Sequence, residues 1–138
     1  MATTPSFAST PVAGSGTVLT ASTVTTGLPS NTVSIFTANT NGGRVDEIDI
    51  CGLATTVANK VQIWLYNPNL GTDTLRYSLI KEVAIPATTV STTAAAYQNT
   101  ITFNNLLLPA GATASQIVAT VTVTESTGFR VTAFGGSF

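Results

Sequence analysis

The sequence predicts an all-β protein, a single antiparallel β-sandwich preceded by an extended N-terminal arm. Eight short segments are rich in β-branched residues and are separated by turn-forming residues. No stretch of 12 residues shows the apolar periodicity of a helix. The chain of 138 residues fits one domain with a core of its own. Eight antiparallel strands at this size favour a jelly roll, with an immunoglobulin-like sandwich as the alternative.

Residues 1–16 are predicted to be the arm, and residues 17–138 the sandwich. The arm consists mainly of Thr, Ser, Ala, Gly and Pro and shows no helical period. A disordered tail is the alternative interpretation. Disordered tails are usually rich in charge, whereas residues 1–43 carry no charged side chain. The composition therefore favours an extended arm that adds little to the core.

Strands are predicted where apolar and β-branched residues alternate or cluster between turn signals. These segments are residues 17–25, 33–38, 44–52, 60–67, 75–85, 100–106, 116–124 and 129–134. The turn signals are NTNGG, NPNLGTD, LPAGAT and STG. Residues 87–99 fit either a loop with a helical turn or a weak strand.

Strict alternation in two segments predicts which side chains face the core. In residues 60–67, one face holds Val61, Ile63 and Leu65, and the other holds Gln62, Trp64 and Tyr66. In residues 116–124, threonines occupy one face, and the apolar face is Ile117, Ala119, Val121 and Val123.

The segment RVDEIDICG (44–52) holds three of the six acidic residues of the chain. On a strand, Ile48 and Ile50 face the core with Asp46 on their side, and Val45, Glu47, Asp49 and Cys51 face the other way. Two carboxylates at this spacing can act as an acid–base pair or bind a hard cation. The chain, however, has no histidine and no second acidic cluster. We therefore predict a polar strand face, paired with a lysine or arginine on a neighbouring strand.

Other catalytic patterns are also missing. Without histidine, the Ser-His-Asp and Cys-His arrangements cannot form within one chain. Cys51 has no basic neighbour in sequence closer than Arg44 and is predicted to be a small buried side chain. The loop 67–73 lacks the final glutamate of a calcium loop, and the glycine-rich stretches lack the lysine and helix of a phosphate loop. The sequence predicts no enzyme activity, no metal and no cofactor.

The small number of charges limits the possible partners. Charged residues make up 8% of the chain, against about 25% in an average soluble domain. The five basic residues are widely separated, which argues against nucleic-acid binding. No apolar run approaches the length of a membrane span, and the N-terminus lacks the pattern of a signal peptide, so synthesis in a cytoplasm is expected. An uncharged surface of this kind usually needs a protein partner.

Both ends of the sequence are candidates for partner binding. The chain ends TAFGGSF, and an exposed terminal phenylalanine lowers solubility unless something covers it. We predict a C-terminal anchor, docked on the same chain or on a partner; a frayed tail is the alternative. The same reasoning applies to the arm. The candidate partner-binding residues are Thr3, Pro5, Phe7, Pro11, Phe134 and Phe138.

Four segments carry a resemblance to known proteins: MATTPSF, TANTNGGRVDEI, LLLPAGAT and RVTAFGGSF. They resemble a group of small β proteins that tailed bacteriophages encode among their head-region genes. The resemblance implies a structural role in the virion. Capsid decoration (cement) proteins are often small, frequently trimeric β domains with an extended arm, at threefold and quasi-threefold positions of the shell.

Two functions are carried forward. The first is a structural virion protein, made in the host cytoplasm, that decorates and stabilises the outer surface of a tailed-phage capsid. It would bind between subunits of the major capsid protein as a homo-oligomer, expected to be a homotrimer. The second is a receptor- or glycan-binding tip of a tail or fibre, with Trp64, Tyr66 and Tyr77 as an exposed aromatic platform.

Overall fold

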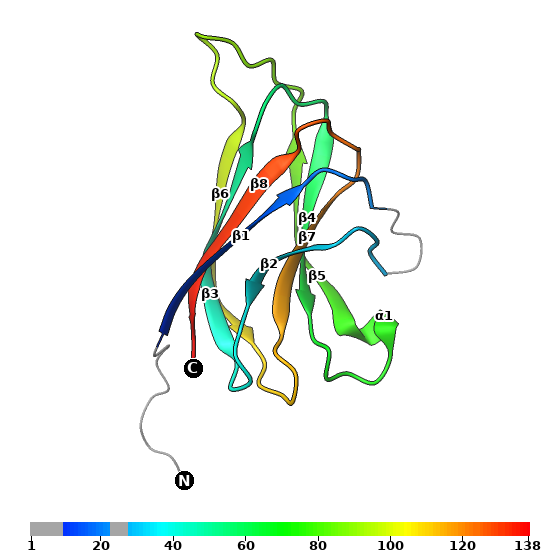
Figure 1. The fold of residues 1–138 in the computed structure, drawn as a ribbon, viewed down its shortest axis with the longest axis vertical. Coiled ribbons are helices and arrows are strands. Elements are labelled where there is room, and N and C mark those ends of the chain that lie inside the picture. The colour runs from blue at the N-terminus through cyan, green and yellow to red at the C-terminus, as the bar shows by residue number, and fades with distance from the viewer. Residues whose placement is uncertain (1–9, 23–27) are drawn as a thin grey trace.

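The computed structural model describes residues 10–22 and 28–138, which form two four-stranded antiparallel sheets packed face to face (Figure 1). The predicted all-β sandwich is confirmed. Sheet A contains, in order, β1 (Thr10–Val18), β8 (Phe129–Ser137), β3 (Gly43–Gly52) and β6 (Gln98–Leu108). Sheet B contains β2 (Val33–Thr37), β7 (Gln116–Val121), β4 (Asn59–Tyr66) and β5 (Tyr77–Ile85). A single helical turn, α1 (Asp73–Arg76), precedes β5.

The first strand pairs with the last, and each following strand pairs with the one that precedes the last pair's partner in sequence. β1 pairs with β8, β2 with β7, β3 with β6 and β4 with β5, as in one long antiparallel ribbon folded over itself. The ladders between β3 and β8 and between β4 and β7 then complete the two sheets. With four strands in each sheet, this order differs from the constant-type immunoglobulin order, in which four strands face three. The jelly roll stays a prediction.

The core lies between the sheets and is built from the alternating apolar residues that the sequence indicates. Val61 and Ile63 of β4 are fully buried, and Leu65 packs against the same cluster. The predicted inward residues of β7 are also fully buried: Ile117, Ala119 and Val121. Val123 is exposed instead, because β7 ends at Val121 and the alternation no longer applies.

A β-bulge in β3 corrects the predicted face of Val45. Ile48 and Ile50 are buried as expected, but Val45 is fully buried too. The register of β3 shifts between Val45 and Glu47 against both β6 and β8. The extra residue, Asp46, resets the alternation, so that Val45 and Ile48 both face the core.

The connections differ from expectation at several places. Residues 19–22, predicted within the strand 17–25, follow the end of β1 at Val18 and lie outside any strand. Leu75 and Arg76, predicted at the start of a strand, belong to α1, and β5 begins at Tyr77. Residues 87–97 form a loop, and β6 begins at Gln98. This loop projects from one end of the sandwich, where the yellow-green chain rises above the strands (Figure 1).

The predicted boundary between arm and domain is wrong for residues 10–16. They are extended, but they belong to β1 and pair with β8 from Thr10–Ser137 to Val18–Phe129. β1 also lies directly against β2. The two strands are so close at Gly14 that a Cβ atom there would overlap the carbonyl oxygen of Ile35. β1 therefore closes one side of the sandwich. Residues 1–9, with Thr3, Pro5 and Phe7, lie outside the described residues, and the arm remains a prediction for them.

Candidate functional site

The acidic segment of β3 forms a polar strand face. Arg44 Nε lies 2.8 Å from Asp46 Oδ1, so the basic partner comes from the same strand and not from a neighbouring one. Asp49 Oδ1 accepts a hydrogen bond of 2.7 Å from Thr100 Oγ1 on β6. Within the described ranges, no three His, Cys, Asp or Glu side chains come together in a way that could hold a metal ion.

Cys51 lies on the outer face of sheet A and is half-buried, so the prediction of a buried side chain is wrong. A hollow of about 210 Å³ is lined by Asp49, Cys51 and Thr100, among others. Its volume is below the 300–1,000 Å³ typical of ligand pockets. Nothing in its lining indicates a catalytic group.

Trp64 is buried on the outer face of sheet B, with 4% of its surface exposed. Its Nε1 donates to Thr120 Oγ1 at 3.1 Å, and that hydroxyl donates to Gln62 Oε1 at 3.1 Å. Trp64 is thus anchored in a hydrogen-bond chain across β4 and β7. It cannot belong to an exposed aromatic platform, which corrects that part of the second hypothesis.

The same chain continues to Glu82 on β5. Gln62 Nε2 donates to Glu82 Oε2 at 2.9 Å, and Lys60 Nζ lies 3.0 Å from Glu82 Oε1. The hydrogen bond from Gln62, and then the one from Lys60, lowers the pKa of Glu82 below its ordinary value. Glu82 is exposed and each of its partners has a structural role, so the arrangement stabilises sheet B and does not suggest catalysis.

Tyr66 and Tyr77 stack at the other end of sheet B, with ring centroids 4.8 Å apart and planes tilted by 35°. With Leu28, Pro29 and Asp73 they line a hollow of about 220 Å³. Asp73 is ion-paired to Arg76 Nη1 at 3.0 Å. This hollow is small, but aromatic rings next to a carboxylate can bind a small polar ligand.

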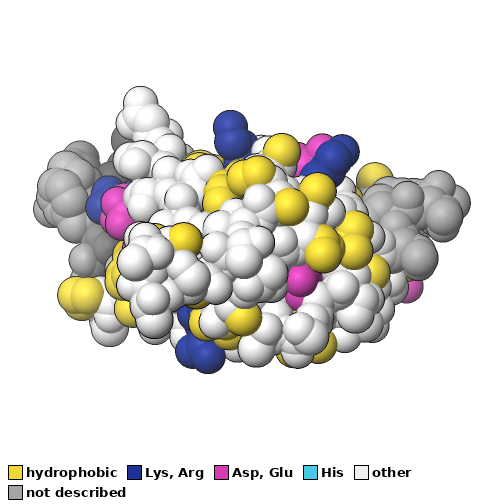
Figure 2. All heavy atoms as spheres, turned by 90° about the horizontal axis from the view of Figure 1, so that it is seen from above, with side chains coloured by type: hydrophobic (Ala, Val, Ile, Leu, Met, Phe, Trp, Pro, Cys, Tyr) yellow, Lys and Arg dark blue, Asp and Glu magenta, His cyan; other side chains and the backbone are white. Residues whose placement is uncertain are grey.

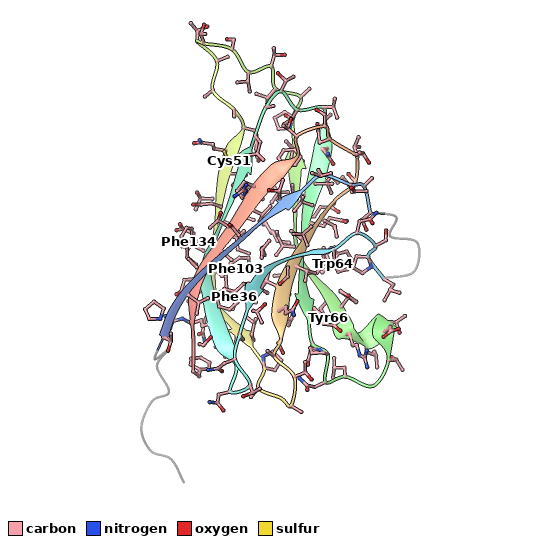
Figure 3. All side chains as sticks on the ribbon, in the orientation of Figure 1. Phe36, Cys51, Trp64, Tyr66, Phe103 and Phe134 are labelled. Atoms are coloured by element: carbon pink, nitrogen blue, oxygen red, sulfur yellow. The ribbon has the colours of Figure 1, made fainter. Side chains whose placement is uncertain are left out.

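The start of β1 and the end of β8 lie side by side at one end of sheet A, which we call the terminal end. Thr10, the first described residue, pairs with Ser137, the last residue of β8 (Figure 1). Pro11 on β1 and Phe134 on β8 lie on adjacent strands and are both exposed on the outer face, Phe134 by 39%. Figure 3 shows Phe134 on the side of the sandwich away from Trp64.

Leu107 on β6 is a third exposed apolar residue at this end, separated from Pro11 by Gly136 and Arg44. The register aligns Pro11 with Gly136, Gly136 with Arg44, and Arg44 with Leu107, so Leu107 lies in the same row of the sheet. Half of its surface is exposed. Sequence reasoning missed this residue. The available signal was the run of three leucines, 106–108, in which strand alternation turns the middle one outwards.

Phe138 is docked against its own chain. Its backbone N–H donates to Gly42 O at 3.2 Å, and its carbonyl oxygen accepts a hydrogen bond from Asn39 Nδ2. Its side chain is half-buried. The last residue is therefore held on the turn between β2 and β3, which keeps the terminal end compact.

The opposite end, which we call the loop end, carries four exposed aliphatic residues: Leu19, Leu53, Val57 and Val123. Glu125 connects the loop after β1 with the loop before β4. Its backbone N–H donates to Leu19 O at 2.8 Å, and its Oε1 accepts from the backbone N–H of Val57 at 3.0 Å. Figure 2, viewed from above, shows hydrophobic side chains scattered among backbone and other side chains, with a few acidic and basic ones.

Comparison of the chain with protein-family models, curated proteins and solved structures finds no match. In the part of the chain that the structure describes, no helix has the length and apolar character to cross a membrane.

Proposed function

We propose that the protein is a structural virion component that decorates and stabilises a tailed-phage capsid. In this proposal it binds through its terminal end between subunits of the major capsid protein, on the outer surface of the shell. The supporting observation is that three exposed apolar residues, Pro11, Leu107 and Phe134, lie at the end of sheet A where β1 starts and β8 ends. The sequence expectation of a homotrimer is part of the same proposal.

The proposed mechanism is association alone. Covering apolar surface at the terminal end stabilises the contact by about 25 cal/mol per Å² of buried apolar area, less the cost of ordering the partners. Many copies on one particle make weak individual contacts sufficient. At this end Arg44 is ion-paired to Asp46, and Glu47 lies directly beside Phe134 on the neighbouring strand, so a partner would meet one carboxylate next to the apolar residues.

The test uses undecorated particles of the phage that encodes this chain. We expect the wild-type protein to bind the head in hundreds of copies, counted by quantitative mass spectrometry and located by cryo-electron microscopy. Phe134→Ser should lower occupancy at least tenfold without changing the melting temperature much. Leu79→Ser is the matched control and should bind normally; Leu79 is an apolar residue on sheet B with 48% of its surface exposed, against 39% for Phe134. Equal binding by the two variants, or no binding to the head, would contradict the proposal.

The second candidate function is a receptor- or glycan-binding tip on a tail or fibre. The observation in its favour is the hollow beside Tyr66 and Tyr77. A few copies per particle at the tail, together with saccharide binding that Tyr77→Ala abolishes, would favour this function over capsid decoration.

A further inference from the structure

We propose that the free edge of β6 binds residues 1–9 of a second copy of this chain as an added strand. The inference concerns self-association and goes beyond the proposed function. It assigns a different partner to residues 1–9, while leaving the exposed residues of the terminal end for the capsid.

The described sheets have four edge strands, and three of them are protected. β1 and β2 lie against each other, because the glycines of β1 leave room for the backbone of β2. β5 carries Lys81 and Glu82, and its register against β4 contains a bulge. Charged side chains and bulges are ways in which proteins prevent further strands from adding to an edge.

β6 lacks such charges. Its sequence, QNTITFNNLLL, contains no charged residue and no proline. From Gln98 to Thr102 it pairs without interruption with β3, and among the described residues it pairs with no other strand. The irregularity begins only after Thr102, towards Asn105, whose φ is 70°. The stretch 98–102 therefore presents unpaired backbone donors and acceptors along a regular edge.

The core is also incompletely covered beneath this edge. Ile101 and Phe103 of β6 pack against the core cluster but stay partly exposed. An added strand would cover these side chains and pair the free backbone groups of β6 at the same time.

Residues 1–9, MATTPSFAS, suit this role in sequence. They carry no charge and include Phe7. The proline at position 5 is compatible with an added strand, because such a strand becomes the new edge and the missing N–H can face solvent. Nine extended residues span up to about 30 Å, enough to reach a neighbouring molecule.

Strand directions favour a second copy over the same chain. β1 and β3 run in one direction, and β8 and β6 in the other. Thr10 lies in the same row as Leu108, three strand spacings or about 14 Å away. If residues 1–9 paired with β6 of their own chain, they would have to run towards Thr10 and would therefore lie parallel to β6. Crossing about 14 Å takes about four extended residues, so only about five would be left to pair. A second copy can add the segment antiparallel, like every named ladder in the described sheets.

The contact is head-to-tail: the N-terminal segment of each copy occupies β6 of the next. Contacts of this type close into rings or continue as filaments. A ring of three would provide the trimer that the sequence analysis expects.

Disulfide trapping tests the inference directly. In a Cys51→Ser background, one protein carries Thr4→Cys, Ser6→Cys or Ala8→Cys, and a second protein carries Thr100→Cys on β6. We expect a disulfide-linked heterodimer when the two are mixed under mild oxidation. Ser78→Cys, an exposed position on the β5 edge, is the matched control and should give at least tenfold less product. Cross-linking equal to that of the control would overturn the inference.

Sedimentation velocity on the purified protein provides the second measurement. The full chain should sediment as an oligomer and a variant lacking residues 2–9 as a monomer, and both should show the same β-rich circular dichroism spectrum. If the two have the same mass, the inference fails. If in addition the truncation abolishes capsid binding, residues 1–9 contact the capsid protein, and the proposed function stands without this inference.

Discussion

At the scale of single residues, Asn59 connects the start of β4 to the chain after β7. Its Oδ1 accepts from the backbone N–H groups of Thr122 and Val123, at 3.1 and 2.9 Å, and its Nδ2 donates to Val123 O at 2.7 Å. Asn59→Ala should lower the free energy of unfolding by about 1–3 kcal/mol, because it removes the side-chain partner of the Val123 N–H and carbonyl, whereas the Thr122 N–H also donates to Lys60 O. Asn104→Ala, at an exposed position of β6, should change it by about 0.5 kcal/mol or less in the same urea titration. Equal effects would show that the Asn59 contacts contribute little.

The carboxylates of β3 give a prediction of the opposite kind. Glu47→Gln combined with Asp49→Asn should change the free energy of unfolding by about 1 kcal/mol or less, because the hydrogen bond that Asp49 accepts from Thr100 lies at the surface. Addition of Mg²⁺ or Ca²⁺ should leave the melting temperature of the wild-type protein unchanged. A rise on adding either ion, absent from the double variant, would reveal a metal site on this face.

Glu82 makes a pH-dependent contribution to stability. Its pKa is lower in the folded protein than in the unfolded chain, so its contribution is present above the ordinary pKa of a glutamate. This contribution is lost as the pH falls through that value towards the folded pKa. The stability advantage of wild type over Glu82→Gln should therefore shrink between about pH 6 and pH 3. Urea titrations at several pH values measure it; a difference that does not change with pH would contradict this account.

At the scale of elements, the start of β1 predicts how many N-terminal residues can be deleted without loss of stability. Deleting residues 2–9 should leave the melting temperature nearly unchanged, because β1 begins at Thr10. Deleting residues 2–16 should lower it by 10 °C or more, or prevent folding, because β8 loses most of its ladder with β1 and keeps only the one with β3, and the contact of the β1 glycines with β2 is lost. Thermal melts of both truncations are the measurement. Similar melts would mean that residues 10–16 add little, as the sequence alone suggested.

At the scale of the whole molecule, the strands that lie inside both sheets should be the most stable part. β8 and β3 are flanked on both sides in sheet A, and β7 and β4 in sheet B. Their backbone amides should exchange with deuterium at least a hundredfold more slowly than those of the projecting loop, residues 87–97. Hydrogen exchange followed by mass spectrometry checks this ranking. Protection of residues 87–97 equal to that of β3 would contradict it.

The sequence by itself determined the class of the fold and most of the core. Alternation of β-branched residues identified Ile63 and Ile117 as inward-facing, because the side-chain period of a strand is a local property of the backbone. The sequence also identified Pro11, Phe134 and Phe138 as candidate partner-binding residues, because exposed apolar residues near chain ends are unusual.

Only the tertiary structure decided what depends on neighbouring strands. Val45 turned inwards because of a bulge defined by its pairing with β6 and β8. Trp64 is buried although it lies on the outer face, where the hydroxyl of Thr120 on a neighbouring strand accepts a hydrogen bond from its indole N–H. The pairing of β1 with β8 makes residues 10–16 part of a strand, and the pairing of β3 with β6 places Leu107 at the terminal end. Both registers pair residues that are far apart in sequence. A local period shows which side chains share a face, but not which strand lies beside them, because that pairing is set by the packing of the whole chain.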